Sequence, residues 1–392
     1  MTQRLYYTDS YLTEFEATLA GISDDGQRIY LDRTAFYPTS GGQPFDLGLL
    51  GGVPVTEVVD EGDRIAHVLA TPTPLQAGPI HAQIDWNRRF DHMQQHTGQH
   101  LLSAVFLDTL KAETVSFHLG AQSATIDLKI DALNPSAVQA VEQRANELVF
   151  KDVPVTIEFQ DANEATDLRK ASDRQGLLRI VSIQSLDRSA CGGTHVRSTA
   201  EIGPILIRKL DKVRGNMRVE FVCGARAVQR ARADYDALSR IGKAFSAPLD
   251  ETPELLTALL ERVAESDKTL RRLTAELATA RGRDLYTRTP PSPDGVRRAI
   301  QRLVTITEEA RAEAQGFCGE PQSVLLVTGS NPVAVLVAAS QDSGFHAGQW
   351  LKSVLSETGG KGGGSAYLAQ GSSSSAALET VVGRFAITSR SS

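Results

Sequence analysis

Two pairs of potential metal ligands, far apart in the chain, constrain the fold more than any other feature of the sequence. The first pair is His96 and His100, which would lie on one face of a helix because residues four apart are neighbours there. The second pair is Cys191 and His195, and the two glycines between them let the backbone bend until thiolate and imidazole converge. These are the ligands that zinc prefers. Together the pairs predict a Zn²⁺ site at which the helix and the loop meet.

Each pair alone is weak evidence for a metal. Two histidines four apart on a helix can belong to a solvated or packed face, and Cys191 can be a buried cysteine in a tight turn. A metalloprotease is disfavoured, because the general-base glutamate of the His-Glu-x-x-His motif is replaced by Thr97. The prediction of zinc therefore depends on the combination of the two pairs.

The bulk properties exclude several classes of protein. The length of 392 residues suits two or three domains. No apolar run approaches the ~20 residues needed to span a bilayer, and the amino terminus lacks the apolar core of a signal peptide, so we expect a cytosolic protein. Three scattered cysteines do not suit a disulfide framework. The net charge of -6 argues against a general coating of nucleic acid but leaves room for local basic surfaces.

The first half of the chain divides into a β-rich part and a mixed part. Residues 1–88 contain short β-prone runs broken by Gly, Pro and Asp, which predict a small β-barrel. Residues 89–224 predict an α+β zinc-binding core, with a helix over 91–106 that carries the histidine pair and a second helix that starts at Asn134-Pro135 and ends at Phe150. The expected strands and hairpin are Phe15–Leu19, Arg28–Leu31, Val53–Val59, Ile65–Leu69, Ala124–Ile130, Leu177–Ile183, and Ile205–Leu210 with Met217–Val222.

The second half predicts a helical arm followed by a small α/β domain. Residues 225–288 should be helical, with leucines at roughly heptad spacing that favour a coiled-coil-like arm and a homodimer through it. After a proline-rich linker over 289–293, residues 294–392 should contain buried strands at Ser323–Val327 and Val333–Ala339. The predicted fold class is therefore α+β and multidomain.

Three further segments are candidates for contact with a ligand. The turn from Phe36 to Pro44 offers polar side chains and backbone amides, although it could also be an ordinary strand connection. The run Gly359–Gly364 lets bare backbone approach a phosphate beside a lysine, or it is a flexible linker. Basic residues near the hairpin form a phosphate-contacting rim or a solvated face, and Arg88 and Arg89 could extend it. The contact candidates are Thr39, Ser40, Gly41, Gly42, Gln43, Arg208, Lys209, Lys212, Arg214, Lys361, Gly362 and Gly363.

Taken in order along the chain, these motifs resemble a known family. The turn Thr34–Gln43, the segment His96–His100 followed by Leu101-Leu102-Ser103-Ala104, and Cys191–His195 resemble the editing domain of alanyl-tRNA synthetase and its free-standing relatives of the AlaX type. The run Gly359–Gly364 with Ala369-Gln370-Gly371 resembles the DHH-associated domain that ends the synthetase, which implies the long form. No aminoacylation domain fits ahead of Met1, so we do not expect the chain to charge tRNA.

The resemblance implies an activity and a site. It implies a hydrolase that removes serine, and also glycine, from mischarged alanine tRNA, with His96, His100, Cys191 and His195 as Zn²⁺ ligands and 89–224 as the editing core. It places Gln99, Ser116 and Gly192 in the catalytic pocket, although the synthetase commonly has a small residue or Thr at the first position and a Gln near the second. It also implies ATP binding. The alternatives are a non-catalytic, zinc-stapled tRNA-binding module and a zinc hydrolase of a small ester or amide.

Overall fold

The computed structural model describes residues 1–72, 78–170 and 175–387. The chain divides into two compact units, Met1–Ile241 and Gly242–Ser392. The α+β fold class predicted from the sequence is confirmed. Among the helices described, none combines the length and apolar character needed to cross a membrane.

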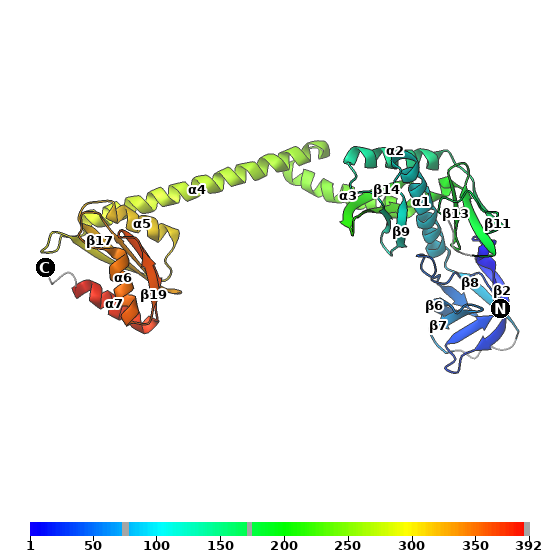
Figure 1. Ribbon diagram of the computed structural model, residues 1–392, viewed down its shortest axis with the longest axis horizontal. Coiled ribbons are helices and arrows are strands. Elements are labelled where there is room, and N and C mark those ends of the chain that lie inside the picture. Colours follow the sequence, from blue (N-terminus) through cyan, green and yellow to red (C-terminus); the bar gives the residue numbers. More distant parts are fainter. Residues whose placement is uncertain (73–77, 171–174, 388–392) are drawn as a thin grey trace. The chain divides into compact units, whose positions relative to one another are not determined.

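The amino-terminal part of the first unit is a closed six-stranded barrel, as predicted (Figure 1). Four of its strands contain the predicted runs, whereas β5 and β8 were not predicted. Strand β8 carries a clear signal, because Ile80, Ala82 and Ile84 alternate inward with exposed neighbours. The barrel order is β2 (Glu14–Ile22), β3 (Arg28–Leu31), β7 (Ile65–Leu69), β6 (Val53–Asp60), β5 (Gly48–Leu50) and β8 (Pro79–Ile84), and β1 (Gln3–Arg4) pairs separately with β4 (Arg33–Thr34).

Helix α1 (Trp86–Leu110) follows the barrel directly and extends beyond both ends of the predicted helix. Asp85 caps it, since its carboxylate accepts a hydrogen bond from the amide of Arg88. Arg89 is fully buried and pairs with Asp46 of the barrel domain, with Nε 3.0 Å from Oδ1. The expectation that Arg89 extends a basic surface is therefore wrong, because the ion pair anchors α1 to the barrel instead.

The rest of the first unit packs two sheets and a helix around α1. Helix α2 (Pro135–Phe150) has the predicted bounds and is capped by Asn134, whose side chain accepts from the amide of Ala137. The predicted hairpin is confirmed and turns at Arg214-Gly215, which both have positive φ. The sheets are β14 (Ile205–Val213), β15 (Asn216–Cys223), β10 (Ala124–Leu128) and β9 (Thr114–Leu119), and β11 (Val155–Asp161), β12 (Leu177–Ile183) and β13 (Asp187–Ala190).

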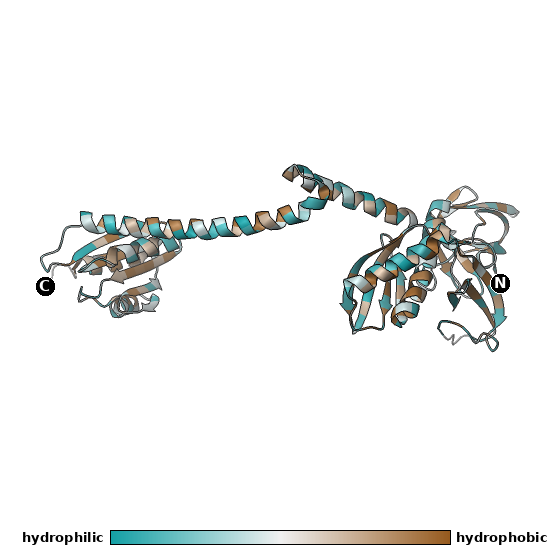
Figure 2. Cartoon of the chain, turned by 90° about the horizontal axis from the view of Figure 1, so that it is seen from above, coloured by the Kyte–Doolittle hydropathy of each residue, from teal (hydrophilic) through white to brown (hydrophobic). Residues whose placement is uncertain are grey.

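The predicted helical arm consists of two helices rather than one continuous stretch. Helix α3 (Gly224–Phe245) ends before Pro248, and α4 (Thr252–Arg288) begins after a short 3₁₀ turn at Leu249–Glu251. The heptad leucines lie on α4, and Figure 2 shows hydrophobic positions that recur along this helix. Most of these side chains are exposed: Leu256, Leu260, Val263, Leu270, Leu273 and Leu277.

The second unit ends in a five-stranded sheet flanked by helices. Both predicted strands are confirmed, and the glycine run forms an edge strand rather than a flexible linker. A Cβ at Gly362 would lie 2.6 Å from Leu355 Cδ1, so glycine lets α6 pack closely on this edge. The order is β16 (Arg297–Leu303), β17 (Ser323–Ser330), β18 (Val333–Ala339), β20 (Leu368–Ser372) and β19 (Lys361–Gly364), with α5 (Glu308–Cys318), α6 (Ala347–Glu357) and α7 (Ser375–Ile387).

Candidate metal centre and adjoining cavity

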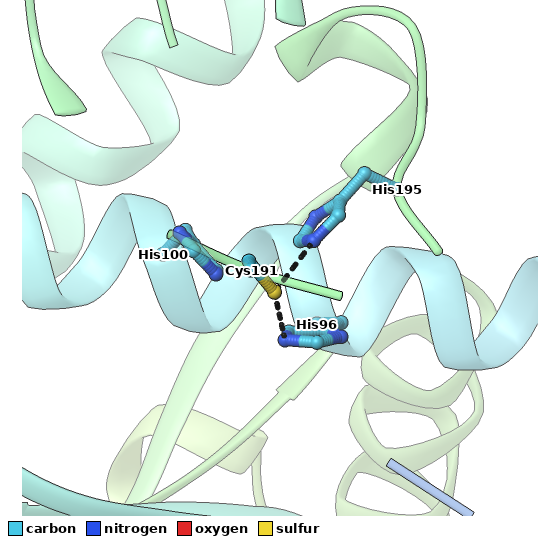
Figure 3. Close-up of side chains that lie close together, drawn as sticks. All are labelled: His96, His100, Cys191 and His195. Carbon is cyan, nitrogen blue, oxygen red and sulfur yellow. Dashed lines mark hydrogen bonds between the residues drawn. The ribbon is translucent and has the colours of Figure 1, made fainter. Parts of the chain in front are cut away.

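The two predicted ligand pairs meet in the interior of the first unit (Figure 3). His96 and His100 project from α1, and Cys191 and His195 come from the loop that follows β13. Their ligand atoms all lie within 4.8 Å of one another, and the Cys191 sulfur is 3.4 Å from His96 Nε2 and 3.3 Å from His195 Nε2. Bonds of typical zinc length in a tetrahedral site place ligand atoms about 3.3–3.8 Å apart. The four side chains could therefore hold a metal ion with little movement.

The loop that carries Cys191 is fixed from two sides. Arg179, on β12, donates from Nη1 to the carbonyl of Cys191 at 2.6 Å and from Nε to the carbonyl of Tyr7 at 2.9 Å. Gly193 lies against the metal centre, where a Cβ would be 2.2 Å from His96 Cε1. Among the described residues, a Cβ at Gly192 would meet only the Tyr7 ring, at 3.7 Å. Of the two glycines, only Gly193 is required by close approach to a ligand.

The buried amide of Gln43 determines which nitrogen of His96 faces the centre. The backbone N–H of Thr194 donates to Gln43 Oε1 at 3.1 Å, and Gln43 Nε2 donates to the Thr194 hydroxyl at 2.8 Å, so the orientation of the amide is fixed. Gln43 Oε1 also lies 2.8 Å from His96 Nδ1, which must therefore carry the proton. The lone pair of Nε2 is left for a metal. Gln43, expected to contact the substrate, instead positions His96.

The other two histidines are held through Nδ1 in the same way. His100 Nδ1 lies 2.8 Å from Asp187 Oδ2, and the same carboxylate pairs with Arg169. His195 Nδ1 lies 3.1 Å from the Thr97 hydroxyl. A ligating histidine usually has its second nitrogen bound to an oxygen in this manner, which fixes the ring and its tautomer. All three histidines are thus prepared to present Nε2 to one point.

Burial and the neighbouring charges set the protonation of the centre. Burial alone would raise the pKa of Cys191, but His96 and His195 lower it well below its ordinary value, which favours the thiolate. Burial, together with the neighbouring His96, lowers the pKa of His195 to about 3. Burial would also lower the pKa of His100, but its hydrogen bond to Asp187 raises this pKa to about 9. Zinc prefers a thiolate with neutral imidazoles, so its binding would release the second ring proton that His100 carries at pH 7.

A small cavity adjoins the metal centre. Its volume is ≈ 190 Å³, and its walls include the predicted pocket residues Gln99 and Ser116 together with His100 and Cys191. Gln99 is buried, and its Nε2 donates to the Ser103 hydroxyl, whereas Oε1 has no partner among the described residues. The Ser116 hydroxyl donates to Asp127 Oδ2 at 2.7 Å, so its lone pairs remain available. Gly192 is not among the described residues that line this cavity.

The predicted glycine-rich turn lies against the outer wall of the same cavity. Thr39, Ser40, Gly41 and Gly42 are exposed, and the backbones of Ser40 and Gln43 hydrogen-bond to each other. A Cβ at Gly42 would lie 2.9 Å from Phe117, which lines the cavity and packs on the His96 ring at a centroid distance of 5.5 Å. Contact of the exposed turn with a substrate stays a prediction.

The predicted basic rim is only partly available for phosphate contacts. Arg208 pairs with Asp234 and Lys209 pairs with Asp211, whereas Lys212 and Arg214 are exposed at the hairpin turn. In the second unit Lys361 is exposed, and a Cβ at Gly363 would meet no atom of the described residues within 4 Å. These positions stay predictions for phosphate contact.

Several residues that support the site were not predicted from the sequence. Two of them, Thr97 and Thr194, lie between the paired ligands, so their position in the sequence was a usable signal. Asp187, Arg169 and Arg179 have no such signal. They reach the site only because the β12–β13 hairpin and the segment before it pack against α1.

The sequence is similar to two kinds of known protein. Residues 178–220, which include Cys191 and His195, match the family described as the threonyl and alanyl tRNA synthetase second additional domain. The alanyl-tRNA editing protein AlaX-L of Pyrococcus horikoshii is 32% identical over 391 residues, which cover 95% of this chain and 94% of that protein.

Alanine–tRNA ligases are similar over the same length of this chain. Those of Pyrococcus furiosus and Methanospirillum hungatei are 31% and 30% identical over 94% of this chain, which spans only 42% and 41% of their length. The similarity to the editing protein, in contrast, runs over nearly the whole of both chains. This chain therefore belongs to the family of alanyl-tRNA editing proteins of the AlaX-L type.

Proposed function

We propose that this chain is a trans-editing hydrolase that cleaves the ester bond of mischarged alanine tRNA and releases the amino acid and free tRNA. Serine is the main amino acid removed, and glycine is a second. The observation that carries the proposal is the small cavity beside the four convergent ligands, since it offers room for a small aminoacyl group next to a metal centre. Full-length similarity to AlaX-L supports it. This substrate places the protein in the cytosol.

The metal proposed for the centre is Zn²⁺. The Sγ to Nε2 distances of 3.4 and 3.3 Å suit tetrahedral zinc, and one thiolate with three imidazoles is a common zinc donor set. When bound, zinc supplies Lewis acidity that can polarise an ester carbonyl or a water molecule. Gln43, Asp187 and Thr97 hold the three imidazoles in place for it. Ester hydrolysis by water needs no nucleotide, so ATP binding is not part of the proposed reaction.

The need for editing follows from the size of the amino acids. A pocket for alanine cannot strongly reject serine or glycine, because a hydroxyl or a methyl group changes binding there by only about 1–3 kcal/mol. Gln99 and Ser116 both line the cavity. We propose that the buried, unpaired Oε1 of Gln99 turns toward the serine hydroxyl and accepts its hydrogen bond, and that the lone pairs of the Ser116 hydroxyl are a second acceptor. Alanine would leave these groups unpaired, which lowers its binding and protects correctly charged tRNA.

Two alternative functions make different predictions. A non-catalytic, zinc-stapled tRNA-binding module would bind mischarged alanine tRNA without releasing the amino acid. A zinc hydrolase of small molecules would cleave a bare serine ester as readily as serine-charged tRNA. We expect the purified chain to release serine from the charged tRNA and to act far more slowly on the bare ester, because phosphate contacts contribute to binding.

The tRNA contacts proposed are those with exposed cations or open backbone. In the first unit they are Lys212 and Arg214 at the hairpin turn, with Arg208 and Lys209 beside them, and the turn Thr39–Gly42 near the cavity. In the second unit they are Lys361, Gly362 and Gly363 on the edge strand. The four parts 1–88, 89–224, 225–288 and 294–392 would then serve as barrel, editing core, arm and tRNA-binding domain.

Helix α4 is proposed to pair with α4 of a second copy. Its hydrophobic positions Leu256, Leu260, Val263, Leu270 and Leu277 follow the d and a spacing of a coiled coil and are exposed. Residues 254–267 carry four acidic residues and one basic residue, whereas 268–288 carry six basic and two acidic residues. An antiparallel pair places the acidic half of one helix beside the basic half of the other, which favours that orientation.

The Leu260→Asp substitution should dissociate this dimer. Burial of each Leu260 contributes about 1.5–3 kcal/mol, so losing both raises the dimer Kd by at least about 100-fold. Light scattering at micromolar concentration should give a dimeric mass for the unmodified chain and a monomeric mass for the variant. Ala258→Asp, on the opposite face of the helix, should stay dimeric. A monomeric mass for the unmodified chain would exclude the pairing.

A further inference from the structure

A second cavity lies in the first unit, beside the first turns of α1 and the start of α3. Its volume is ≈ 570 Å³, and its walls include Trp86, Arg88, Phe90, His92 and Arg226. It shares none of the described lining residues with the cavity of the metal centre. The established family and the proposed reaction give it no role.

His92 is the anomalous residue of this cavity. It is only 3% exposed, and its Nδ1 is fully buried without a hydrogen-bond partner among the described residues. Buried polar atoms are nearly always hydrogen-bonded, so the unpaired ring nitrogen of His92, a residue of the cavity wall, is available to hydrogen-bond a ligand. Burial, and to a smaller extent Arg88, lowers the pKa of His92 to about 4, so the ring is neutral at pH 7. A neutral imidazole offers one donor and one acceptor, which suits the polar edge of a ligand.

The other walls supply two neighbouring aromatic rings and the guanidinium groups of Arg88 and Arg226, of which Arg226 is paired with Asp91, a further lining residue. The rings of Trp86 and Phe90 lie side by side, with centroids 5.2 Å apart and planes tilted by 34°, and both are partly exposed. Arg88 is partly exposed and is held by a hydrogen bond of 3.0 Å from Nε to the carbonyl of Phe45. Arg226 is fixed by Asp91, with which it forms hydrogen bonds of 2.7 and 2.6 Å. An aromatic face beside cations is the usual surface for a stacked base and its phosphate.

This cavity and the metal centre both lie along helix α1. His92 and His96 both project from α1, one helical turn apart, which corresponds to about 6 Å along the helix. A ligand bound to His92 would therefore lie within the span of a few nucleotides from an aminoacyl group held beside His96.

We propose that this second cavity binds a nucleotide of the single-stranded acceptor end of tRNA, with its base stacked on Trp86 and its polar edge hydrogen-bonded to His92. The inference rests on the proposed function and adds a second subsite to it. It assigns to the chain a base contact near the ester, separate from the phosphate contacts of the hairpin turn and the edge strand.

Tryptophan fluorescence gives a direct test. The chain contains two tryptophans, Trp86 and Trp350, so Trp350→Phe leaves Trp86 as the only tryptophan. Titration of this variant with uncharged alanine tRNA should quench the emission to saturation, because a stacked base quenches the indole. The same tRNA without its single-stranded 3′ nucleotides should leave the emission unchanged. An unchanged emission while filter binding shows that intact tRNA is bound would overturn the inference.

Kinetics of His92→Leu give a second test. We expect the KM for serine-charged tRNA to rise about 10-fold with little change in kcat, since one base contact is lost. Phe150→Leu, at an exposed position on α2, is the matched control and should leave KM unchanged. An unchanged KM in His92→Leu would contradict the inference. Quenching without any deacylation would instead refute the proposed reaction while supporting the cavity, and deacylation without quenching would refute the cavity alone.

Discussion

Cys191→Ala is expected to lower the rate of serine release by at least about 100-fold while leaving the affinity for alanine tRNA nearly unchanged. Cys191 supplies the only thiolate among the four convergent ligands, and its sulfur lies between the Nε2 atoms of His96 and His195. Its loss removes the softest zinc ligand, and misplacing reacting groups by about 1 Å can reduce a rate on the order of 100-fold. In the proposed function, binding depends instead on exposed cations elsewhere, such as Lys212 and Lys361, and it should therefore depend on salt.

Single-turnover deacylation and filter binding on the same preparation measure the two effects separately. Cys318→Ala is the matched control, because this thiol lies in the second unit and belongs to no group of potential metal ligands among the residues that the structure describes. Near-normal turnover in a folded Cys191→Ala protein would show that the metal centre is not the active site. The chemistry would then have to be sought at the turn Thr39–Gln43.

Gly193→Ala is expected to empty the metal centre, whereas Gly192→Ala retains the metal. The new Cβ at position 193 would lie 2.2 Å from His96 Cε1 and 2.9 Å from Gln43 Oε1. Neither group can easily move, since both are buried and hydrogen-bonded to each other. At position 192 the Cβ would meet, within the part of the chain that the structure describes, only the Tyr7 ring, at an ordinary contact distance of 3.7 Å. The adjacent glycines therefore form a matched pair that differs in this one contact.

Metal analysis of freshly purified protein is the measurement. We expect about one zinc per chain in the unmodified protein and in Gly192→Ala, and well below half of that in Gly193→Ala after reconstitution. Full zinc in Gly193→Ala would mean that His96 is not a ligand. Absence of zinc from all three proteins, with no gain on reconstitution, would contradict the proposed metal itself.

Local signals in the sequence were sufficient for much of the secondary structure. Asn134 as a cap, followed by Pro135, predicted the start of α2, because both residues favour the first turn of a helix through local interactions alone. The alternation of apolar and charged residues beside a short turn likewise predicted the β14–β15 hairpin. The break before α4 was not predicted, because the spacing of the leucines indicates a helix but not the residue at which it begins; Pro248 stands between α3 and α4. Strand β8 was not predicted, although Ile80, Ala82 and Ile84 alternate inward along it.

The composition of the metal centre was predictable, but the support around it was not. His96, His100, Cys191 and His195 are adjacent in pairs, so spacing alone could identify them. Asp187 and the buried pair of Arg89 with Asp46 depend on contacts between distant segments, which no local pattern encodes. Gln43 is a second example of this limit. Its motif predicted contact with a ligand, whereas in the folded chain the turn packs against the metal centre and the side-chain amide of Gln43 hydrogen-bonds to His96 and Thr194.

The central claim is that the chain removes the wrong amino acid and spares the right one. The most direct test is to incubate the purified protein with alanine tRNA charged separately with serine, glycine and alanine, and to follow the amino acid released. We predict rapid release of serine, release of glycine, and release of alanine near the uncatalysed rate, because alanine leaves the polar groups of the cavity unpaired. Serine release no faster than in buffer, or alanine release as fast as serine release, would contradict the account.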